Sequence, residues 1–341
     1  MAKHAKTINL ALQGGGTHGA LAWGILDRLL EDGSIAMDCI SATSAGAMNA
    51  VILAQGMANG GPDEARALLA HFWKKISDAG AFFSPVKVTW LEQWMGITPE
   101  FSQGYFLFDM MTKLFSPYEF NPANINPLRD IVQSLVDFKQ ISQSRMLRLF
   151  ICATNVKTGK IKVFQNGEIS LDAVMASSCL PFLFQAVQVQ DDYYWDGGYM
   201  GNPALFPLIY ESHHNDILII HINPIQREKI PQKASEIINR MNEVSFNSSL
   251  MREMRAVAFV SKMLDEGWIK DEYAKTMKRV YMHAIRADKA MENYSVASKL
   301  NTDWEFILHL FDQGRHLADD WLKENFIHLG KRSSIDINEY L

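Results

Sequence analysis

The nine residues LQGGGTHGA at positions 12–20 connect two apolar runs, TINLAL at 7–12 and LAWGILDRLL at 21–30. Runs of this kind predict a buried strand before the glycines and a helix after them. Glycine lets backbone N–H groups approach an anion closely, and the start of a helix favours negative charge. The stretch therefore predicts an α/β fold with a site for a phosphate, a carboxylate or a transient oxyanion.

Strand and helix signals alternate along the first two thirds of the chain. Strands are predicted at 7–12, 37–40, 147–153, 161–164 and 216–222, and helices at 19–31, 44–57, 63–76 and 127–136. Such alternation predicts a layered α/β domain. Beyond about residue 225 the strand signals largely stop, so we expect residues 226–341 to form a helical C-terminal region.

The composition is that of an ordinary globular protein, with 48% hydrophobic and 21% charged residues. The formal net charge is −5 and both signs are scattered, so no basic stripe favours nucleic-acid binding. Three widely spaced cysteines, Cys39, Cys152 and Cys179, suit a reducing compartment, and no Cys/His spacing predicts a metal site. The apolar runs are too short for a signal peptide or a membrane span, so we expect a cytoplasmic protein.

The glycine spacing Gly14-x-Gly16-x-x-Gly19 also matches the dinucleotide-binding fingerprint between a strand and a helix. That fingerprint needs an acidic residue about 20 positions further on, at the end of the next strand. Asp38 lies near that distance, but it begins the predicted second strand instead of ending it. A Walker loop is excluded because no Gly-Lys-Ser/Thr follows the glycines.

A serine follows the second predicted strand, in the segment SATSAGAMNA at 41–50. Ser44 has Ala42 two positions before it and Gly46 two positions after it, which is the setting of a nucleophile elbow. Small residues are needed there because the tight strand-to-helix turn brings the strand and the helix close together. The alternative is a plain helix N-cap, the commonest role of a serine at this position.

A hydroxyl nucleophile needs a base, and YYWDGG at 193–198 contains a carboxylate. Asp196 ends an aromatic strand, and Gly197 and Gly198 let the following loop hold the carboxylate at a fixed angle. An apolar surround would raise the pKa of Asp196 and make it a better proton acceptor near neutral pH. Taken alone, the pattern is better explained by an Asp-Gly hairpin turn.

The order GGGTHG, ATSAG and, after a long insert, DGG resembles the patatin-like phospholipase family. The segments TSAGAMNA, CATNVKTGK and SSCLPFLFQAV resemble that family's elbow helix, central strand and final catalytic block, over roughly residues 7–210. The resemblance implies a three-layer α/β/α fold with a mostly parallel sheet, and residues 1–225 as an acyl hydrolase domain. It also implies ester hydrolysis by a Ser44–Asp196 dyad without a catalytic histidine. The oxyanion hole would be formed by backbone N–H groups of three glycines, Gly14, Gly15 and Gly16.

One position departs from the family's usual Gly-x-Ser-x-Gly elbow, because Ala42 takes the place of the first glycine. A methyl group is the smallest intrusion, so we expect the turn to form. His18 and His221 are the histidines that could approach Ser44 in a triad, and we interpret both as structural. We interpret Cys179 as a small core residue.

Residues 81–120 are unusually aromatic, since eleven of these forty are Phe, Tyr or Trp against 11% in the whole chain. Such an insert could form a lid whose side chains line an acyl pocket or enter a lipid interface. Trp90 and Trp94 are the side chains that we expect to act there. A packed subdomain that covers the core explains the composition equally well.

The sequence thus predicts a lipid acyl hydrolase of phospholipase A or lysophospholipase type, with a phospholipid or other lipid ester as substrate and no cofactor or metal. Peripheral contact with a membrane is part of this hypothesis. Two alternatives stay open. One is a nucleotide-binding protein that uses the glycine loop. The other is a non-catalytic lipid- or partner-binding module on a degenerate hydrolase scaffold, which Ala42 and the aromatic insert motivate.

Overall fold

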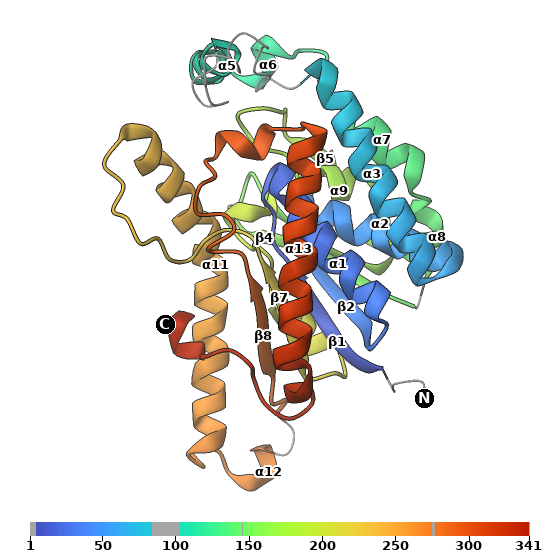
Figure 1. The fold of residues 1–341 in the computed structure, drawn as a ribbon, viewed down its shortest axis with the longest axis vertical. Helices are drawn as coiled ribbons and strands as arrows, with labels where there is room; N and C mark the ends of the chain where they lie inside the picture. The colour runs from blue at the N-terminus through green and yellow to red at the C-terminus, as the bar shows by residue number, and fades with distance from the viewer. Residues whose placement is uncertain (1–4, 84–102, 145, 275–276, 341) are drawn as a thin grey trace.

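A central sheet organises the molecule (Figure 1). The computed structural model describes residues 5–83, 103–144, 146–274 and 277–340, and these residues contain eight strands in one sheet. The strands lie in the order β5-β6-β3-β2-β1-β7-β8, and β4 pairs with β3 off this path. Their bounds are β1 Lys6–Leu12, β2 Ile35–Thr43, β3 Arg148–Asn155, β4 Ile161–Gln165, β5 Val187–Val189, β6 Asp192–Asp196, β7 Asp216–His221 and β8 Tyr281–Arg286.

The sheet is mostly parallel. The pairs β1–β2, β1–β7, β2–β3 and β7–β8 are parallel, whereas β3–β4, β3–β6 and β5–β6 are antiparallel. The carboxyl ends of the parallel strands therefore meet at one edge, which is where open α/β sheets place their ligands.

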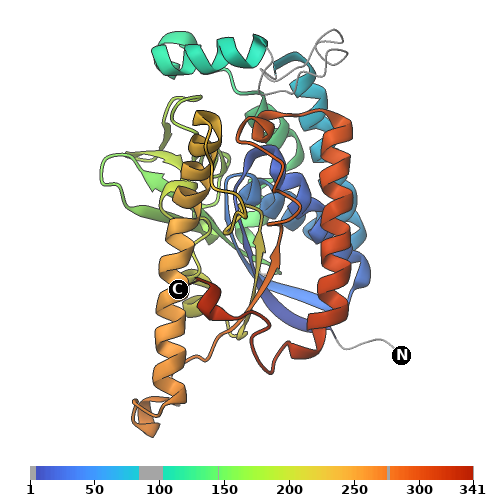
Figure 2. The same ribbon diagram turned by 60° about the vertical axis from the view of Figure 1, so that its left-hand side comes forward.

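Helices cover both faces of the sheet (Figures 1 and 2). One face carries α1 Gly19–Asp32, α2 Ala45–Gly60, α3 Pro62–Phe83, α7 Pro127–Leu135, α8 Phe138–Gln143, α9 Leu171–Ser177 and α13 Trp304–Asn325. The other face carries α10 Phe206–Glu211 and α11 Ala234–Asp265. This arrangement confirms the predicted three-layer α/β/α fold.

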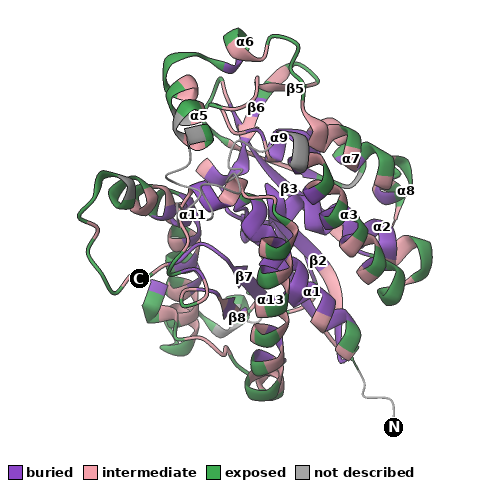
Figure 3. Cartoon of the chain, turned by 45° about the horizontal axis from the view of Figure 1, so that its top comes forward, coloured by how far each residue is buried: buried purple, intermediate pink, exposed green. Residues whose placement is uncertain are grey.

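The two apolar cores follow from the alternation of side chains along each buried strand. In β1, Leu10 and Leu12 belong to the core beneath α1 and α2, whereas Ala11 between them belongs to the core beneath α10 and α11. Both faces of the strand are covered, which explains why its sequence is a continuous apolar run. Figure 3 shows buried residues in the sheet and exposed residues on the outer sides of the helices.

Two glycines let the C-terminal helix α13 lie directly on α1. A β-carbon placed on Gly24 would lie 2.0 Å from the Phe311 carbonyl oxygen, and one on Gly314 would lie 2.1 Å from the Leu21 carbonyl oxygen. Any larger side chain would push the helices apart. The chain beyond residue 225 is thereby packed against the first helix.

The region 226–341, predicted to be helical, also contains one strand that the sequence did not predict, because β8 extends the sheet beside β7. Its sequence, YMHAIR, contains a histidine and an arginine that interrupt the apolar pattern expected of an inner strand. His283 is nevertheless buried, with Nε2 3.0 Å from Asp216 Oδ1 and Nδ1 2.9 Å from Ser334 Oγ. The domain boundary near residue 225 stays a prediction.

The aromatic insert is described only in its second half. Residues 103–120 contain α5 Gln103–Leu114 and α6 Pro117–Phe120, which lie at the top of the molecule in Figures 1 and 2. Trp90 and Trp94 lie outside the described residues. Within the part of the chain that the structure describes, no helix is long and apolar enough to cross a membrane.

Candidate active site

Ser44 occupies a strained turn between β2 and α2. Its backbone angles are φ 55° and ψ −123°, a left-handed conformation that is unusual for a residue with a side chain. The Ser44 N–H donates to Ser177 Oγ at 2.9 Å, and the Met48 N–H donates to the Ser44 carbonyl oxygen at 3.1 Å. The Ser44 side chain makes no capping hydrogen bond. The serine therefore lies at the N-cap position without acting as an N-cap, and its hydroxyl is left for another role.

The elbow is packed as tightly as the sequence predicts. A β-carbon on Gly46 would lie 2.5 Å from the Leu12 carbonyl oxygen, so α2 needs a glycine there to lie against β1. Ala42 is fully buried in β2, where it pairs with Leu12 on one side and Ile151 on the other. The turn at Ser44 forms with alanine at this position, which confirms that expectation.

Backbone contacts fix Asp196 at the end of β6. Its N–H donates to the Cys179 carbonyl oxygen at 2.7 Å, and Thr154 Oγ1 donates to the Asp196 carbonyl oxygen at 2.8 Å. The chain then enters a 3₁₀ turn, η4 Gly197–Tyr199, and the Gly198 N–H donates to Asp196 Oδ1 at 2.7 Å. The Asp-Gly pair thus opens a turn that holds the carboxylate, and no hairpin strand follows it.

The Asp196 carboxyl is fully buried. Burial raises the pKa of Asp196 to about 6, while the neighbouring Ser44 hydroxyl, the Gly198 N–H and the Lys299 cation oppose this rise. Asp196 Oδ2 has no hydrogen-bond partner among the described residues. The site therefore combines a strained serine with a carboxylate oxygen that can accept a proton near neutral pH.

The glycine loop lies against Ser44. A β-carbon on Gly14 would lie 2.6 Å from Ser44 Cβ. The Gly14 N–H donates to Asn202 Oδ1 at 2.7 Å, and Asn223 Nδ2 donates to the Gly14 carbonyl oxygen at 2.8 Å. The Gly14 N–H is thus engaged by a side chain, and its place in the oxyanion hole stays a prediction. For the N–H groups of Gly15 and Gly16, no acceptor is found among the described residues.

The two candidate histidines lie in structural environments. His18 is buried, its Nε2 lies 2.8 Å from Ser298 Oγ, and burial lowers the pKa of His18 to about 3. His221 is buried against the Tyr340 ring, with centroids 6.3 Å apart, and burial lowers its pKa as well. Neither histidine has a hydrogen bond to Ser44 or Asp196 within the described part of the chain. Cys179 is buried, and burial raises the pKa of its thiol to about 12, as expected of a core cysteine.

The family model described as patatin-like phospholipase matches residues 10–209, more than half of the 341-residue chain. The chain belongs to the patatin-like phospholipase family. The match spans the glycine loop, the elbow at Ser44 and the turn at Asp196. Membership of this family supports a lipid hydrolase.

Solved structures give more distant likenesses. The chain is similar to VipD from Legionella pneumophila, with 15% sequence identity and a TM-score of 0.42, over 94% of this chain and 67% of that one. It is also similar to the type III effector protein ExoU, with 16% identity and a TM-score of 0.33, over 94% and 53%. A third similar structure is the complex of SpcU with ExoU from Pseudomonas aeruginosa, with 14% identity and a TM-score of 0.29, over 94% and 54%. This chain spans about half the length of ExoU, and no curated protein sequence matches it.

Asp38, the candidate acidic residue of the dinucleotide-binding pattern, has a structural role. Asp38 lies inside β2, where Arg148 Nη2 and Ser212 Oγ each donate to its Oδ2 at 2.8 Å. The dinucleotide pattern needs a carboxylate at the end of the strand that is free to bind a ribose. Asp38 meets neither condition.

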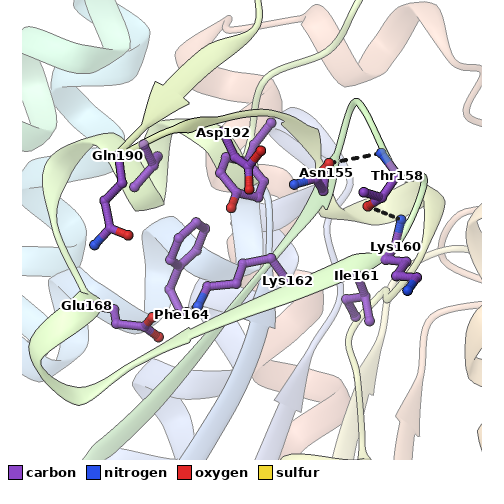
Figure 4. Close-up of a pocket in the computed structure, with 11 residues that line it drawn as sticks. Asn155, Thr158, Lys160, Ile161, Lys162, Phe164, Glu168, Gln190 and Asp192 are labelled. Atoms are coloured by element: carbon purple, nitrogen blue, oxygen red, sulfur yellow. Dashed lines mark hydrogen bonds and ion pairs between the residues drawn. The ribbon is translucent and has the colours of Figure 1, made fainter.

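A pocket of about 340 Å³ lies at the β3–β4 hairpin and the β5–β6 ribbon, and its lining includes neither Ser44 nor Asp196 (Figure 4). It is lined by Asn155, Thr158, Lys160, Ile161, Lys162, Phe164, Glu168, Val189, Gln190, Asp192 and Tyr194. Lys162 pairs there with Glu168 at 2.5 Å. Neither Ser44 nor Asp196 lines this pocket, so it is not the candidate active site. Within the described ranges, no group of three or more His, Cys, Asp or Glu residues is placed to hold a metal ion.

Sequence reasoning missed the asparagines that hold the glycine loop. Asn202 precedes Pro203 just after η4, and Asn223 precedes Pro224 just after β7. Both side chains reach Gly14, and Gln13 Oε1 accepts from the Asn223 N–H at 3.0 Å. The two Asn-Pro steps could have indicated these residues. The residue before a proline does not continue regular structure, so each step leaves an amide side chain close to the point where β6 or β7 has ended.

Proposed function

We propose that this protein is a serine-dependent lipid ester hydrolase, of phospholipase A or lysophospholipase type, that uses Ser44 and Asp196. The observation that carries the proposal is the elbow itself. A buried serine with φ 55° lies against the glycine loop and beside a buried carboxylate. Strain of this kind is retained in proteins mainly at functional sites.

The proposed reaction needs only the chain's own groups. Ser44 Oγ attacks the acyl carbonyl carbon while Asp196 Oδ2 accepts the hydroxyl proton. The negative charge that develops on the carbonyl oxygen is stabilised by the N–H groups of Gly15 and Gly16. Asp196 then returns the proton to the leaving alcohol. A water molecule hydrolyses the acyl-enzyme, again with Asp196 as the base.

The structure favours this proposal over the two alternatives from the sequence. A nucleotide-binding protein would need an acidic residue free at the end of β2, whereas Asp38 is paired inside that strand. A degenerate, non-catalytic scaffold was motivated by Ala42 and by the aromatic insert, and the strained turn at Ser44, which forms with Ala42 in place, removes the first of these grounds.

The proposal includes binding of the protein to a lipid surface. Exposed apolar side chains lie in two segments, 107–125, which includes α5 and α6, and 230–244, which includes the start of α11. The helices α5 and α6 lie at the top of the molecule, the end toward which β1 and β2 run (Figures 1 and 2). The exposed apolar side chains are Leu107, Met110, Leu114, Phe115, Tyr118 and Ile125 in the first segment and Ile230, Ile237, Ile238, Met241 and Val244 in the second. Apolar groups exposed beside an active site favour binding to a membrane surface.

Covalent labelling tests the proposal directly. A fluorophosphonate probe should modify the wild-type protein, and mass spectrometry should place the adduct on Ser44. Ser44→Ala should abolish labelling, whereas Ser134→Ala, which removes an exposed hydroxyl on α7, should leave it unchanged. An unlabelled folded wild type, or equal labelling of Ser44→Ala, would refute the dyad.

A further inference from the structure

A turn from the C-terminal part of the chain lies directly on the glycine loop. In η5, Ala297–Leu300, the Lys299 carbonyl oxygen would lie 2.4 Å from a β-carbon placed on Gly16. The preceding Ser298 Oγ lies 2.8 Å from His18 Nε2. Residues 297–300 lie beyond the 10–209 segment that the family model matches. A segment outside the family motif therefore forms one wall of the loop.

The Lys299 side chain continues from this turn toward the same loop. Its Nζ donates to Asn223 Oδ1 at 3.0 Å, and Asn223 Nδ2 donates to the Gly14 carbonyl oxygen at 2.8 Å. Because a cation can only donate hydrogen bonds, it fixes which end of the amide points at it. The ammonium group therefore orients Asn223 so that the amide N–H₂ holds Gly14.

Lys299 also reaches the side of the site that carries Asp196. Its Nζ lies 5.1 Å from the centroid of the Phe246 ring, on α11. A β-carbon on Gly198 would lie 2.5 Å from Phe246 Cε1, and the Gly198 N–H is the donor to Asp196 Oδ1. One partly buried cation is thus connected to both halves of the dyad site, through Asn223 on one side and through Phe246 on the other.

We propose that Lys299 is a positioning residue for the hydrolysis: it holds the glycine loop through Asn223 and keeps a positive charge near the Asp196 carboxylate. This inference rests on the proposed ester hydrolysis. It assigns to the C-terminal part of the chain a role in the reaction that the family motif does not contain.

Other charged and titratable groups surround the pair. Glu243 on α11 and Arg227 before α11 act on Lys299, and Lys299 acts on His18 in the 3₁₀ turn η1, Gly16–His18. Asp196 acts on Cys179 and Tyr199. Burial lowers the pKa of Lys299 to about 8, and the carboxylates of Glu243 and Asp196 oppose this fall. Lys299 therefore carries its charge at neutral pH. That charge lowers the pKa of Asp196 and keeps it ionised.

The first experiment removes the charge and follows kcat/KM against pH with a short soluble ester. In Lys299→Met the acidic limb should move to higher pH, because Asp196 loses the cation that favours its charged form. We expect kcat to fall about tenfold or more, with KM nearly unchanged. Lys299→Arg should return the acidic limb of the profile to its wild-type position. In the wild type we expect kcat/KM to fall again near pH 8, and in Lys299→Arg this alkaline fall should move to higher pH.

A second variant separates the two parts of the role. Asn223→Leu breaks the connection to Gly14 but keeps the cation, so kcat should fall while the acidic limb stays in place. Lys262→Met is the matched control, since that lysine also lies over an aromatic ring, Trp268 at 5.6 Å, but on an exposed part of α11. It should behave as the wild type.

The outcomes distinguish this inference from the proposed function. An active wild type together with a folded Lys299→Met that keeps both its kcat and its acidic limb would overturn the role of Lys299. A wild type that is neither labelled at Ser44 nor active on esters would instead overturn the hydrolase. Fluorophosphonate labelling and melting temperature, measured on each variant, show whether a loss of rate reflects unfolding.

Discussion

The two parts of the chain contribute differently to the candidate site. The segment that matches the family, residues 10–209, contains the groups proposed to react, namely Ser44, Asp196 and the loop glycines. The remainder contains further groups that hold them, among them Asn223, Phe246 and Lys299. The first part is organised mainly by backbone geometry at strand ends, with Asn202 as its own support for the glycine loop. The second acts through side chains that cross the sheet edge.

This difference indicates that the reacting groups and their support can change independently. A substitution in the first part should stop the chemistry, because each group there has one role that no neighbour can replace. A substitution in the second part should alter rate, pH dependence or membrane binding and leave some activity. The predictions below follow this order.

The largest effect is expected at the dyad. Ser44→Ala and Asp196→Asn should each lower hydrolysis of a short ester by about 10³-fold or more, since they remove the nucleophile and the proton acceptor. Both substitutions are nearly isosteric, so the circular dichroism spectrum should be that of the wild type. Activity within tenfold of the wild type in either folded variant would contradict the assignment.

A methyl group in the glycine loop should have the next largest effect. Gly14→Ala places a carbon 2.6 Å from Ser44 Cβ, so the loop must move away from the elbow. Loss of a correctly placed oxyanion site costs about 10²-fold in kcat. Gly167→Ala is the matched control, because a β-carbon at Gly167 would meet no atom within 4 Å. Equal activities of the two variants, measured as kcat on a soluble ester, would place the loop outside the reaction.

The pH profile should report the buried carboxylate. Asp196 must be ionised to accept a proton, and its pKa is raised to about 6. We therefore expect kcat/KM to fall about tenfold for each pH unit below 6 and to be level just above it. A raised pKa also means that Asp196 destabilises the fold once it is charged, so Asp196→Asn should raise the melting temperature at pH 8. That gain should disappear at about pH 4, and a pH-independent gain would point to another cause.

Substitutions of exposed apolar residues on α11 test the contribution of the second part of the chain. Met241, near the start of α11, is 67% exposed, and Phe259, near its other end, is 58% exposed. The two positions are about 27 Å apart along the helix. Met241→Asp should weaken hydrolysis of phospholipid vesicles about fivefold, equivalent to about 1 kcal/mol of lost apolar contact, and spare a soluble butyryl ester. Phe259→Asp should change neither activity. Equal losses for the two variants on vesicles would indicate a general effect of charge.

The same contrast explains what the sequence could predict. The glycine loop, the elbow and Asp196 depend on local conformation, and each has a short signature whose order along the chain identified the family. Lys299 has none, because its role comes from the packing of η5 on Gly16, more than 250 residues away. The engagement of the Gly14 N–H was missed for the same reason, since its acceptor is the side chain of Asn202. Strand β8 was missed because two partners distant in the sequence, Asp216 and Ser334, satisfy a histidine that looks polar in the sequence.

The smallest effect is expected at the two histidines, one from each part of the chain, and its sign should differ between them. His18 has a buried hydrogen bond to Ser298, whereas neither ring nitrogen of His221 has a partner among the described residues. His18→Leu should therefore destabilise the protein by about 1 kcal/mol at pH 7.5, because a buried hydrogen bond is lost. This loss should shrink toward pH 5, because the pKa of His18 is also depressed and the histidine itself becomes costly to the fold there. His221→Leu should stabilise the protein by a similar amount, because two unpaired polar atoms leave the core. The depressed pKa of His221 makes this histidine more costly to the fold as the pH falls below the ordinary pKa of histidine, so the gain in stability should grow toward pH 5.

Urea unfolding at pH 7.5 and pH 5 measures the stability differences of both variants. A loss of stability in His221→Leu, or a loss of ester hydrolysis comparable to that of Ser44→Ala, would show that this histidine has a partner or a function that its buried position beside Tyr340 does not reveal.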